Sequence, residues 1–343
     1  MRKLALLIVG LLLSVGVSAF AAGQNEGTKN ASSTAASSEV INLKLANYSA
    51  PGDPGYIAAE MFAKGVDQAS HGRIHVTVYP NNALGSPPEQ LEQTVLGSVD
   101  LSVPTQGALD KYDKRFAVVM LPFIFSGYKQ AHDVLDGPFK DWVSKDLAKL
   151  GLVYIANWEY GFRNITNNVR PISTPADVKG LKIRTPPEIQ LQAAMEALGA
   201  NVTKIAFNEL YMALKQGVVD GEENPVSVIL SQKFYEVQKY LAITHHVYNS
   251  EVNVMNIKSW NRLTPQDQQI IVDQSKKAGA YMRKAVMDGE TETIKKLESL
   301  GMKVTYPKIA PFRAEMGPAY KTIAAYAGKD YVDKFVQMVK ETP

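Results

Sequence analysis

The strongest constraint on the fold is the order strand, helix, strand at the start of the regularly patterned part of the chain. Apolar and polar residues alternate in 41–45 and again in 74–78, and residues 54–70 carry apolar side chains at helical spacing. Two strands of this length joined through a helix form a βαβ unit, in which the strands are parallel. We therefore expect an α/β protein.

The same reading extends along the chain. Further helices are predicted from Ser86-Pro87-Pro88-Glu89 and over 129–135 and 139–150, and further strands over 99–103, 152–156 and 181–183, with a buried apolar segment at 121–125. Thr264 caps a helix that runs to about Leu300. At 1.5 Å per residue such a helix is long enough to reach across two lobes.

Two segments, 89–100 and 209–220, share Glu, Gly, Val and Asp at the same offsets, and each is predicted as a helix closed by glycine and followed by a strand. One interpretation is convergence, because helix–Gly–strand junctions favour this pattern. The other is two lobes of similar build that face each other across a cleft.

The first residues indicate export. Arg2 and Lys3 precede an apolar run over 4–17, and Ala19-Phe20-Ala21 supplies a small-x-small cleavage site. We expect a signal peptide over 1–21, a flexible leader over 22–39, and a soluble mature protein in a periplasm.

Composition excludes several classes. The chain has no cysteine, which removes disulfides, thiolate metal sites and a cysteine nucleophile. Its 37 Lys+Arg against 34 Asp+Glu give a formal charge of +3, and loss of Arg2 and Lys3 leaves 3 − 2 = +1. This balance argues against a nucleic-acid or membrane-surface partner.

The segments Gly161-Phe-Arg163-Asn-Ile-Thr166, Gly180-Leu-Lys-Ile-Arg184-Thr-Pro186 and Val219-Asp-Gly-Glu-Glu-Asn224-Pro225 supply two arginines and an asparagine that could hold a small carboxylate. Arg184 ends a predicted strand, and Thr185-Pro-Pro-Glu188 is predicted to form a capping box with proline at the first helical position. A fixed cation beside a helix N-terminus, at the carboxyl end of a strand, favours an anion.

Enzyme motifs are scarce. The sequence contains no G-x-S-x-G elbow, P-loop, H-E-x-x-H or G-x-G-x-x-G pattern, and we expect no enzyme activity, no cofactor and no metal. The histidine pairs 71/75 and 245/246 lack a third ligand nearby. Glu222 and Glu223 are adjacent, so on a strand or turn their side chains point apart, which disfavours glycosidase chemistry.

Residues 40 to about 335 resemble the solute receptors of tripartite ATP-independent periplasmic (TRAP) transporters, of the DctP type. The resemblance rests on the Arg163 segment, the Gly-Leu-Lys-Ile-Arg184 strand, the Phe207-Asn-Glu-Leu-Tyr helix start and the Val-Asp-Gly-x-Glu-Asn224-Pro segment, in the family's order. It implies an α/β, two-lobed periplasmic-binding-protein fold of type II-like topology. It further implies mixed sheets flanked by helices and a long C-terminal helix that spans both lobes.

The resemblance also implies roles. The residue that matches Arg184 makes the main salt bridge to a ligand carboxylate, and those that match Arg163 and Asn224 complete its hydrogen bonds. From the residues alone, Arg184 could instead form a surface salt bridge, Arg163 could stack on a ring or pair with a carboxylate, and Asn224 could be a turn residue. Glu222 stands where the family often has glutamine, which leaves the charge near the ligand open.

Further residues are predicted to line the pocket. The resemblance places Phe207 against the ligand's carbon chain, although a core position is equally compatible. Glu89 is first a capping residue and second an acceptor for ligand hydroxyls. The further candidates are side chains at strand ends or with stacking or hydroxyl groups: Asn47, Tyr48, Gln106, Trp158 and Tyr248. This set suits a hydroxylated acid, such as a uronate or a sugar acid.

We expect one lobe over 40–160 and about 250–285, and a second over 161–249 and about 286–343. The predicted mechanism is capture of the acid by lobe closure and delivery to one small and one large integral membrane subunit. A monomer is the default state. Two alternatives are a receptor for an ATP-driven importer or a sensor, and a secreted enzyme that acts on a carboxylate.

Overall fold

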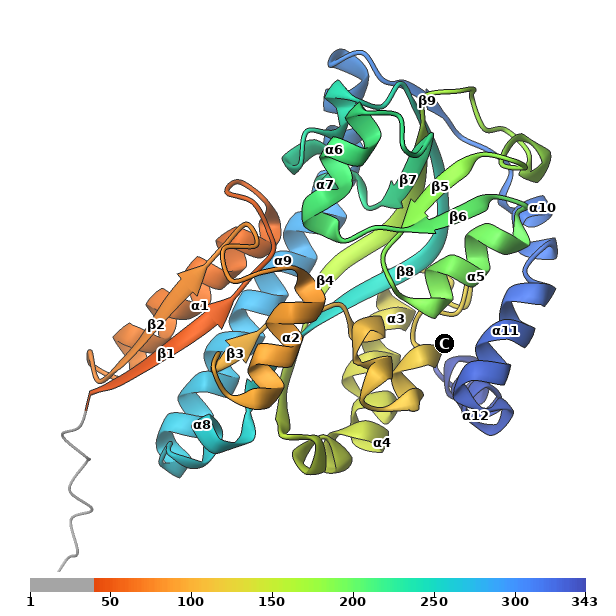
Figure 1. The fold of residues 1–343 in the computed structure, drawn as a ribbon. Coiled ribbons are helices and arrows are strands. Elements are labelled where there is room, and N and C mark those ends of the chain that lie inside the picture. The colour runs from red at the N-terminus through yellow and green to blue at the C-terminus, as the bar shows by residue number, and fades with distance from the viewer. Residues whose placement is uncertain (1–39) are drawn as a thin grey trace, which may run out of the picture. The chain divides into compact units, whose positions relative to one another are not determined.

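The computed structural model describes residues 40–343. The predicted signal peptide and leader, 1–39, lie outside the described residues. The described chain forms a mixed sheet of nine strands with helices packed against it (Figure 1). The strands are β1 (Ile41–Ala46), β2 (Ile74–Tyr79), β3 (Leu101–Ser102), β4 (Leu152–Asn167), β5 (Lys182–Thr185), β6 (Asn201–Lys204), β7 (Gly221–Asn224), β8 (Tyr240–Asn256) and β9 (Lys303–Thr305).

The described residues form twelve α-helices, and those over 226–231, 257–261, 309–314, 317–327 and 329–341 were not predicted from the sequence. The helices are α1 (Pro54–Ala69), α2 (Pro87–Leu96), α3 (Tyr128–Asp136), α4 (Pro138–Leu147), α5 (Ile189–Ala197), α6 (Leu210–Lys215), α7 (Val226–Ser231), α8 (Ile257–Asn261), α9 (Pro265–Ser299), α10 (Ile309–Ala314), α11 (Gly317–Ala327) and α12 (Lys329–Glu341). Short 3-10 helices lie between them, including Gln106–Lys111 and Phe207–Glu209.

The sheet has two halves of the same build. Its order is β2-β1-β3-β8-β4-β7-β5-β6, with β9 beside β8. In one half β1 is parallel to β2 and β3, and in the other β5 is parallel to β6 and β7. Each set then meets a long antiparallel strand, β3 with β8 and β7 with β4. The predicted βαβ unit is confirmed, and the two similar segments end at β3 and β7, which hold equivalent places.

Strands β4 and β8 connect the halves, because they pair with each other along nearly their whole length. The predicted strand over 152–156 is only the first third of β4. Register shifts between Tyr154 and Ala156, Glu159 and Gly161, and Arg163 and Ile165 interrupt the pairing. Each bulge changes which residues face one side, so the strand shows no continuous alternation in the sequence.

The predicted long helix is confirmed as α9, which ends one residue before the expected Leu300. Its earlier turns contribute Ile271 and Met282 to the core cluster of β1, α1 and β2. Its later turns contribute Ile294 and Leu297 to the cluster that contains α6, α7 and the first residues of β8. The helix therefore packs against both halves of the sheet.

One of the two predicted capping boxes is present. The backbone N–H and the hydroxyl of Ser86 both donate to Glu89 Oε2, at 2.6 and 2.7 Å. The capping box predicted at Thr185 is wrong: Thr185 is the last residue of β5, and α5 begins only at Ile189. The Glu188 N–H donates to the Pro186 carbonyl in a tight turn, and the Glu188 side chain bonds to Thr105 instead.

Helix α9 crosses β4 at a glycine. A Cβ atom built on Gly279 would lie 2.4 Å from the carbonyl oxygen of Asn157 and 3.0 Å from the Trp158 ring. Both are fixed neighbours, because Trp158 is fully buried and its indole N–H donates to the Ser275 carbonyl at 3.0 Å. Only glycine allows this approach without a shift of the helix.

We expect Gly279→Ala to destabilise the protein by about 1–3 kcal/mol, because the strain of overpacking exceeds the gain in helix propensity of roughly 1 kcal/mol. Gly289→Ala is the matched control on the same helix, since nothing lies within 4 Å of its Cβ position. That change should stabilise the protein by about 0.5–1 kcal/mol. Chemical denaturation measures both, and an equal effect at the two positions would contradict the argument.

Candidate functional site

Both halves of the sheet contribute to a cavity of about 470 Å³. Residues of one half reach it from the start of α2 and from the loop after β3, and residues of the other from the carboxyl ends of β5 and β7. The lining residues are Tyr48, Pro87, Pro88, Glu89, Leu91, Glu92, Thr105, Ala108, Lys111, Tyr112, Tyr160, Arg163, Arg184, Pro186, Pro187, Glu188, Lys204, Ile205, Ala206, Phe207 and Asn224.

Arg184 lies in the wall of this cavity, at the carboxyl end of β5, with 1% of its surface exposed. Its Nε donates to the Ile205 carbonyl at 2.9 Å, and its guanidinium carbon lies 6.0 Å from the centre of the Phe207 ring. Nη2 is buried without a hydrogen-bond partner among the described residues. Burial lowers the pKa of Arg184 to about 10, against the charges of Glu222 and Glu223, so it stays a cation at neutral pH.

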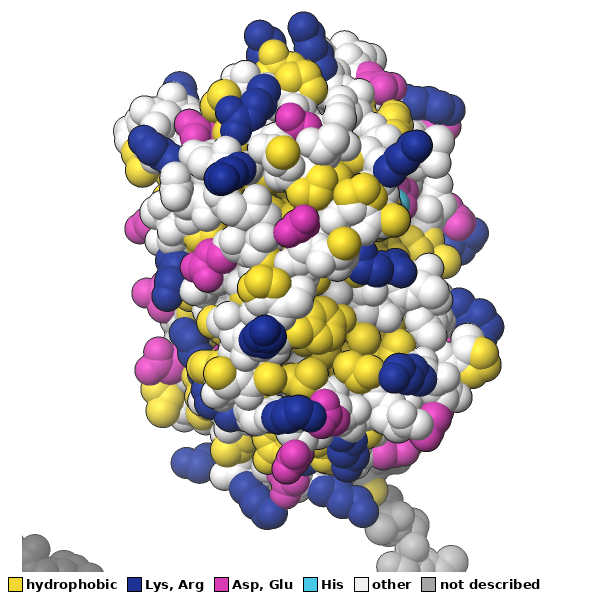
Figure 2. All heavy atoms as spheres, turned by 90° about the vertical axis from the view of Figure 1, so that its right-hand side faces the viewer, with side chains coloured by type: hydrophobic (Ala, Val, Ile, Leu, Met, Phe, Trp, Pro, Cys, Tyr) yellow, Lys and Arg dark blue, Asp and Glu magenta, His cyan; other side chains and the backbone are white. Residues whose placement is uncertain are grey.

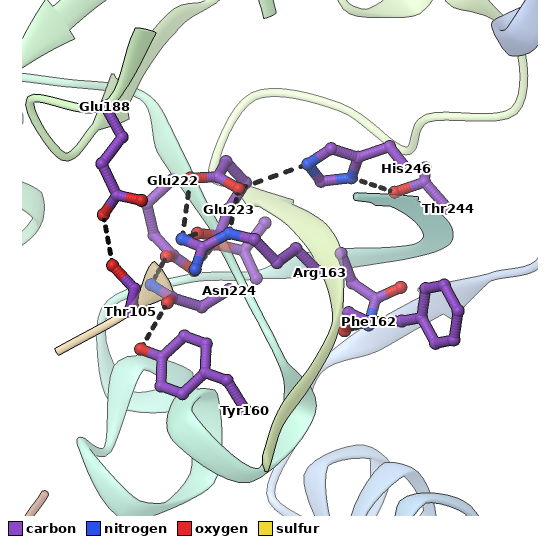
Figure 3. A network of polar contacts seen from close by, with 12 residues as sticks. Thr105, Tyr160, Phe162, Arg163, Glu188, Glu222, Glu223, Asn224, Thr244 and His246 are labelled. Atoms are coloured by element: carbon purple, nitrogen blue, oxygen red, sulfur yellow. Dashed lines mark hydrogen bonds and ion pairs between the residues drawn. The ribbon is translucent and has the colours of Figure 1, made fainter. Parts of the chain in front are cut away.

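Arg163 lines the same cavity and also forms an ion pair. Its Nε and Nη2 donate to the two carboxylate oxygens of Glu223, and Nη2 donates to the Glu223 carbonyl as well (Figure 3). Burial opposes the ionised form of Glu223, but the Arg163 guanidinium keeps the pKa of that carboxyl below its usual range. The carboxylate pairing considered from the sequence is therefore present in a residue that also faces the cavity.

Asn224 is held from two sides. Its Oδ1 accepts from the Tyr160 hydroxyl at 3.1 Å, and its Nδ2 donates to Glu222 Oε2 (Figure 3). Tyr160 itself lines the cavity, and the Arg163 guanidinium carbon lies 5.5 Å from the centre of its ring. Arg163, Arg184 and Asn224, the three carboxylate contacts predicted from the resemblance, are thus brought to one wall.

Glu222 lies behind Asn224 and is fully buried. The Thr166 hydroxyl is 2.9 Å from Glu222 Oε1 and also 2.9 Å from Gln238 Oε1. The Thr166 hydroxyl carries one proton and donates to one of these oxygens at a time, so a proton on Glu222 Oε1 would let both hydrogen bonds form together. Consistently, burial and the charge of Glu223 raise the pKa of Glu222 to about 7.

Three further predicted residues line the cavity. Phe207 packs edge to face against Tyr48, with ring centres 5.6 Å apart, and the Tyr48 hydroxyl donates to Glu251. Glu89 lies at the rim with its carboxylate bonded to Ser86. The binding roles of these side chains remain predictions.

The other four predicted residues lie outside the cavity lining, each with partners of its own. Trp158 packs against Phe62 under α9, and the Tyr248 hydroxyl donates to Glu159 at 3.1 Å. The remaining two are buried amides: Asn47 donates to the Gly55 carbonyl, and Gln106 donates to the Tyr154 hydroxyl at 2.8 Å. Sequence position at a strand end did not distinguish side chains that face the cavity from those that face the core.

Several lining residues were not predicted. Tyr160 was not predicted because residues three apart in a regular strand point to opposite faces. The register shift at Gly161, which has φ 112°, allows both Tyr160 and Arg163 to line the cavity. Glu188 was interpreted only as a helix cap. No sequence signal distinguished Thr105, Tyr112, Lys111 or Lys204 from ordinary surface and loop residues.

The surface agrees with the predicted charge balance. Figure 2 shows one face, on which lysine and arginine side chains are interspersed with acidic and apolar ones. Within residues 40–343, no helix is long and apolar enough to span a bilayer. The same residues contain no cluster of three or more His, Asp or Glu side chains arranged to hold a metal ion.

Residues 45–326 match the family described as bacterial extracellular solute-binding protein, family 7 (DctP). The chain belongs to this family. It is 33% identical over 308 residues to the sialic acid-binding periplasmic protein SiaP of Vibrio cholerae, covering 90% of this chain and 96% of the relative.

Solved structures agree with the family assignment and with the predicted two-lobed fold. A TRAP periplasmic solute-binding protein from Bordetella bronchiseptica, with density interpreted as pantoate, is 34% identical with a TM-score of 0.84, over 88% of this chain and 99% of that one. The sugar acid binding protein of Advenella mimigardefordensis, in complex with galactonate, is 30% identical with a TM-score of 0.85, over 89% and 99%. A similar protein from Sulfurospirillum deleyianum holds succinate, at 29% identity and a TM-score of 0.82, over 88% and 99%.

The raised pKa of Glu222 predicts a pH dependence of stability. Between the ordinary glutamate value of about 4.5 and about 7, the folded protein holds a proton that the unfolded chain releases, so the free energy of unfolding falls as pH rises through this window. In Glu222→Gln, the side-chain oxygen can still accept the hydrogen bond from Asn224 Nδ2, and the side-chain NH₂ can donate to Thr166. We expect it to stabilise the protein at pH 8 by about 1–3 kcal/mol and to flatten the decline.

Thermal unfolding of the unliganded protein from pH 5 to 8 measures this effect. Glu92→Gln, at the exposed rim of the same cavity, removes an equal charge and should keep the wild-type dependence. If Glu222→Gln unfolds with the same pH dependence as Glu92→Gln, the buried proton is not held by Glu222.

Proposed function

We propose that this protein is a periplasmic receptor for a hydroxylated organic acid, such as a uronate or a sugar acid, and delivers it to the membrane subunits of a TRAP transporter. The observation that carries the proposal is the Arg184 guanidinium, a buried cation in the cavity wall whose Nη2 has no acceptor in the part of the chain that the structure describes. A ligand carboxylate supplies both the missing hydrogen-bond acceptor and the counter-charge.

The ligand's carboxylate would lie against Arg184, with Asn224 and Arg163 on either side. A guanidinium presents a planar fork that fits a carboxylate with two parallel hydrogen bonds, each worth roughly 1.5–3 kcal/mol when charge-assisted. Phe207 and Tyr48 offer ring faces and edges to the carbon chain. Tyr160 and Thr105 offer hydroxyls, and Glu89 offers a carboxylate at the rim, for the ligand's polar groups.

Capture would proceed by closure. The cavity is lined from both halves of the sheet, and the halves are connected through β4, β8 and α9. The bulges in the β4–β8 pair lie beside the cavity residues Tyr160 and Arg163, where small changes in backbone angles would rotate one half against the other. Contacts with the ligand that exist only in the closed form would then favour closure.

The receptors named among the relatives support the ligand class. SiaP is named for sialic acid, and the Bordetella and Advenella structures hold pantoate and galactonate, all of which combine a carboxylate with hydroxyl groups. The succinate complex keeps a dicarboxylate as the second candidate. The family is one of binding proteins, which favours a receptor over a secreted enzyme.

The test is thermal unfolding of the purified protein against uronates, aldonates, dicarboxylates, keto acids, amino acids and neutral sugars. A ligand that binds the folded state raises the unfolding midpoint by mass action. We expect shifts from hydroxylated acids, and their loss in Arg184→Ala, because removal of the cation leaves a buried carboxylate unpaired at a cost of about 2–5 kcal/mol.

Lys182→Ala is the matched control, because it removes the same charge from an exposed position two residues earlier on β5. It should keep the wild-type shifts. Shifts from neutral sugars alone, or an undiminished shift in Arg184→Ala, would show that the carboxylate does not bind at Arg184.

A further inference from the structure

A buried carboxyl group in the cavity wall, that of Glu188, forms no salt bridge with any of the described residues. Glu188 lies in the turn between β5 and α5 and is 7% exposed. Its Oε1 accepts from the Thr105 hydroxyl at 3.0 Å (Figure 3). Its Oε2 is buried without a hydrogen-bond partner among the described residues.

The position of this carboxyl is fixed by packing. A Cβ atom on Gly107 would lie 2.6 Å from Glu188 Oε2, so the carboxyl occupies space that any side chain at 107 would need. Thr105 and Gly107 come from the loop and 3-10 helix after β3, whereas Glu188 follows β5. The group therefore lies where the two halves of the sheet meet at the cavity.

The charges around Glu188 do not neutralise it. The cation that acts on it most is Arg163, which is already paired with Glu223. The other charged groups that act on it, Asp110 and Glu223, are both acidic. Burial raises the pKa of Glu188 to about 7, with Arg163 and Thr105 opposing and the two acidic neighbours adding to the shift.

The buried charges of the cavity wall therefore suit one ligand carboxylate. Arg163 is neutralised by Glu223, and Arg184 is available for the ligand's first carboxylate. A second ligand carboxylate inside the cavity would meet Glu188 with no buried cation left among the lining residues. The lining lysines, Lys111 and Lys204, are exposed at the rim, where solvent screens them.

We propose that Glu188 is a specificity-determining residue that makes the site select acids with one carboxylate and an uncharged hydroxylated remainder over dicarboxylates of the same length. This inference rests on the proposed function, because it takes Arg184 as the anchor. It adds that the selection weakens on the acid side of neutral pH, where Glu188 takes up a proton and loses its charge.

Six-carbon aldonates and aldarates test the inference, because galactonate and galactarate, or gluconate and glucarate, differ only by a terminal CH₂OH or carboxylate. Calorimetric titration at constant ionic strength, at pH 5.5 and 8.5, gives the ratio of their dissociation constants. In the wild type we expect preference for the aldonate by roughly ten- to thirtyfold at pH 8.5, the scale of two like charges about 8–10 Å apart at an effective dielectric of about 20. At pH 5.5 the preference should shrink severalfold.

Glu188→Gln keeps an acceptor for Thr105 and removes the charge. We expect it to bind the aldonate within about threefold of wild type and to lose most of the preference at pH 8.5, with little change between the two pH values. Glu196→Gln removes an exposed charge on α5, outside the cavity lining, and should keep the wild-type ratio and its pH dependence.

The outcomes separate the two proposals. If no hydroxylated acid binds, or if Arg184→Ala still binds them, the proposed function fails and this inference fails with it. If aldonates bind through Arg184 but the ratio in Glu188→Gln equals that of the wild type, only the role of Glu188 is overturned. A ratio that changes equally in Glu196→Gln would assign the selection to general surface charge.

Discussion

The antiparallel pairing of β4 with β8 is the constraint on which the rest of the structure depends. These two strands carry every covalent and hydrogen-bonded connection between the parallel sets β2-β1-β3 and β7-β5-β6 within the sheet. The pairing is interrupted three times, and the interruptions at Gly161 and Ile165 flank Arg163. The same irregular backbone thus links the two halves and aims the side chains of the cavity.

Two buried charged side chains in the candidate site reduce the stability of the unliganded protein. Among residues 40–343, Nη2 of the almost completely buried Arg184 and Oε2 of the buried Glu188 have no hydrogen-bond partner. Groups of this kind destabilise a fold unless a partner arrives, because burial removes the water that would otherwise solvate them. Their presence together in one cavity wall is difficult to explain by packing alone. It is consistent with a wall shaped for a polar, singly charged guest.

The sequence was sufficient to predict the repeating features. The βαβ unit, the capping box at Ser86 and the extent of α9 all depend on local periodicity and end signals, which act over a few residues. Arg184 could also be singled out from the sequence, because an arginine at a strand end beside a proline-rich turn is a local pattern. The resemblance supplied Arg163 and Asn224, which local patterns alone left open.

What the sequence did not predict depends on contacts between distant segments. Tyr160 faces the cavity only because a bulge shifts its strand, and a bulge is specified by the partner strand as much as by Gly161. Glu188 is turned toward Thr105, 83 residues away, so a rule about helix starts misassigned it. Trp158 has an aromatic ring of the kind that stacks on ligands, but it packs under α9. Gly279, which has no side chain, lets the helix lie close to this ring.

The hydrogen bonds behind Asn224 determine which ligand groups the Tyr160 hydroxyl can bind. Glu222 Oε2 accepts from the Asn224 amide, and Asn224 Oδ1 accepts from the Tyr160 hydroxyl. Because Glu222 takes up the amide N–H of Asn224, the amide oxygen of Asn224 is turned toward Tyr160. The Tyr160 hydroxyl has given its proton to that oxygen, so its own oxygen can accept a hydrogen bond from a ligand hydroxyl but cannot donate to a ligand carbonyl. Glu222, which does not line the cavity, sets that preference.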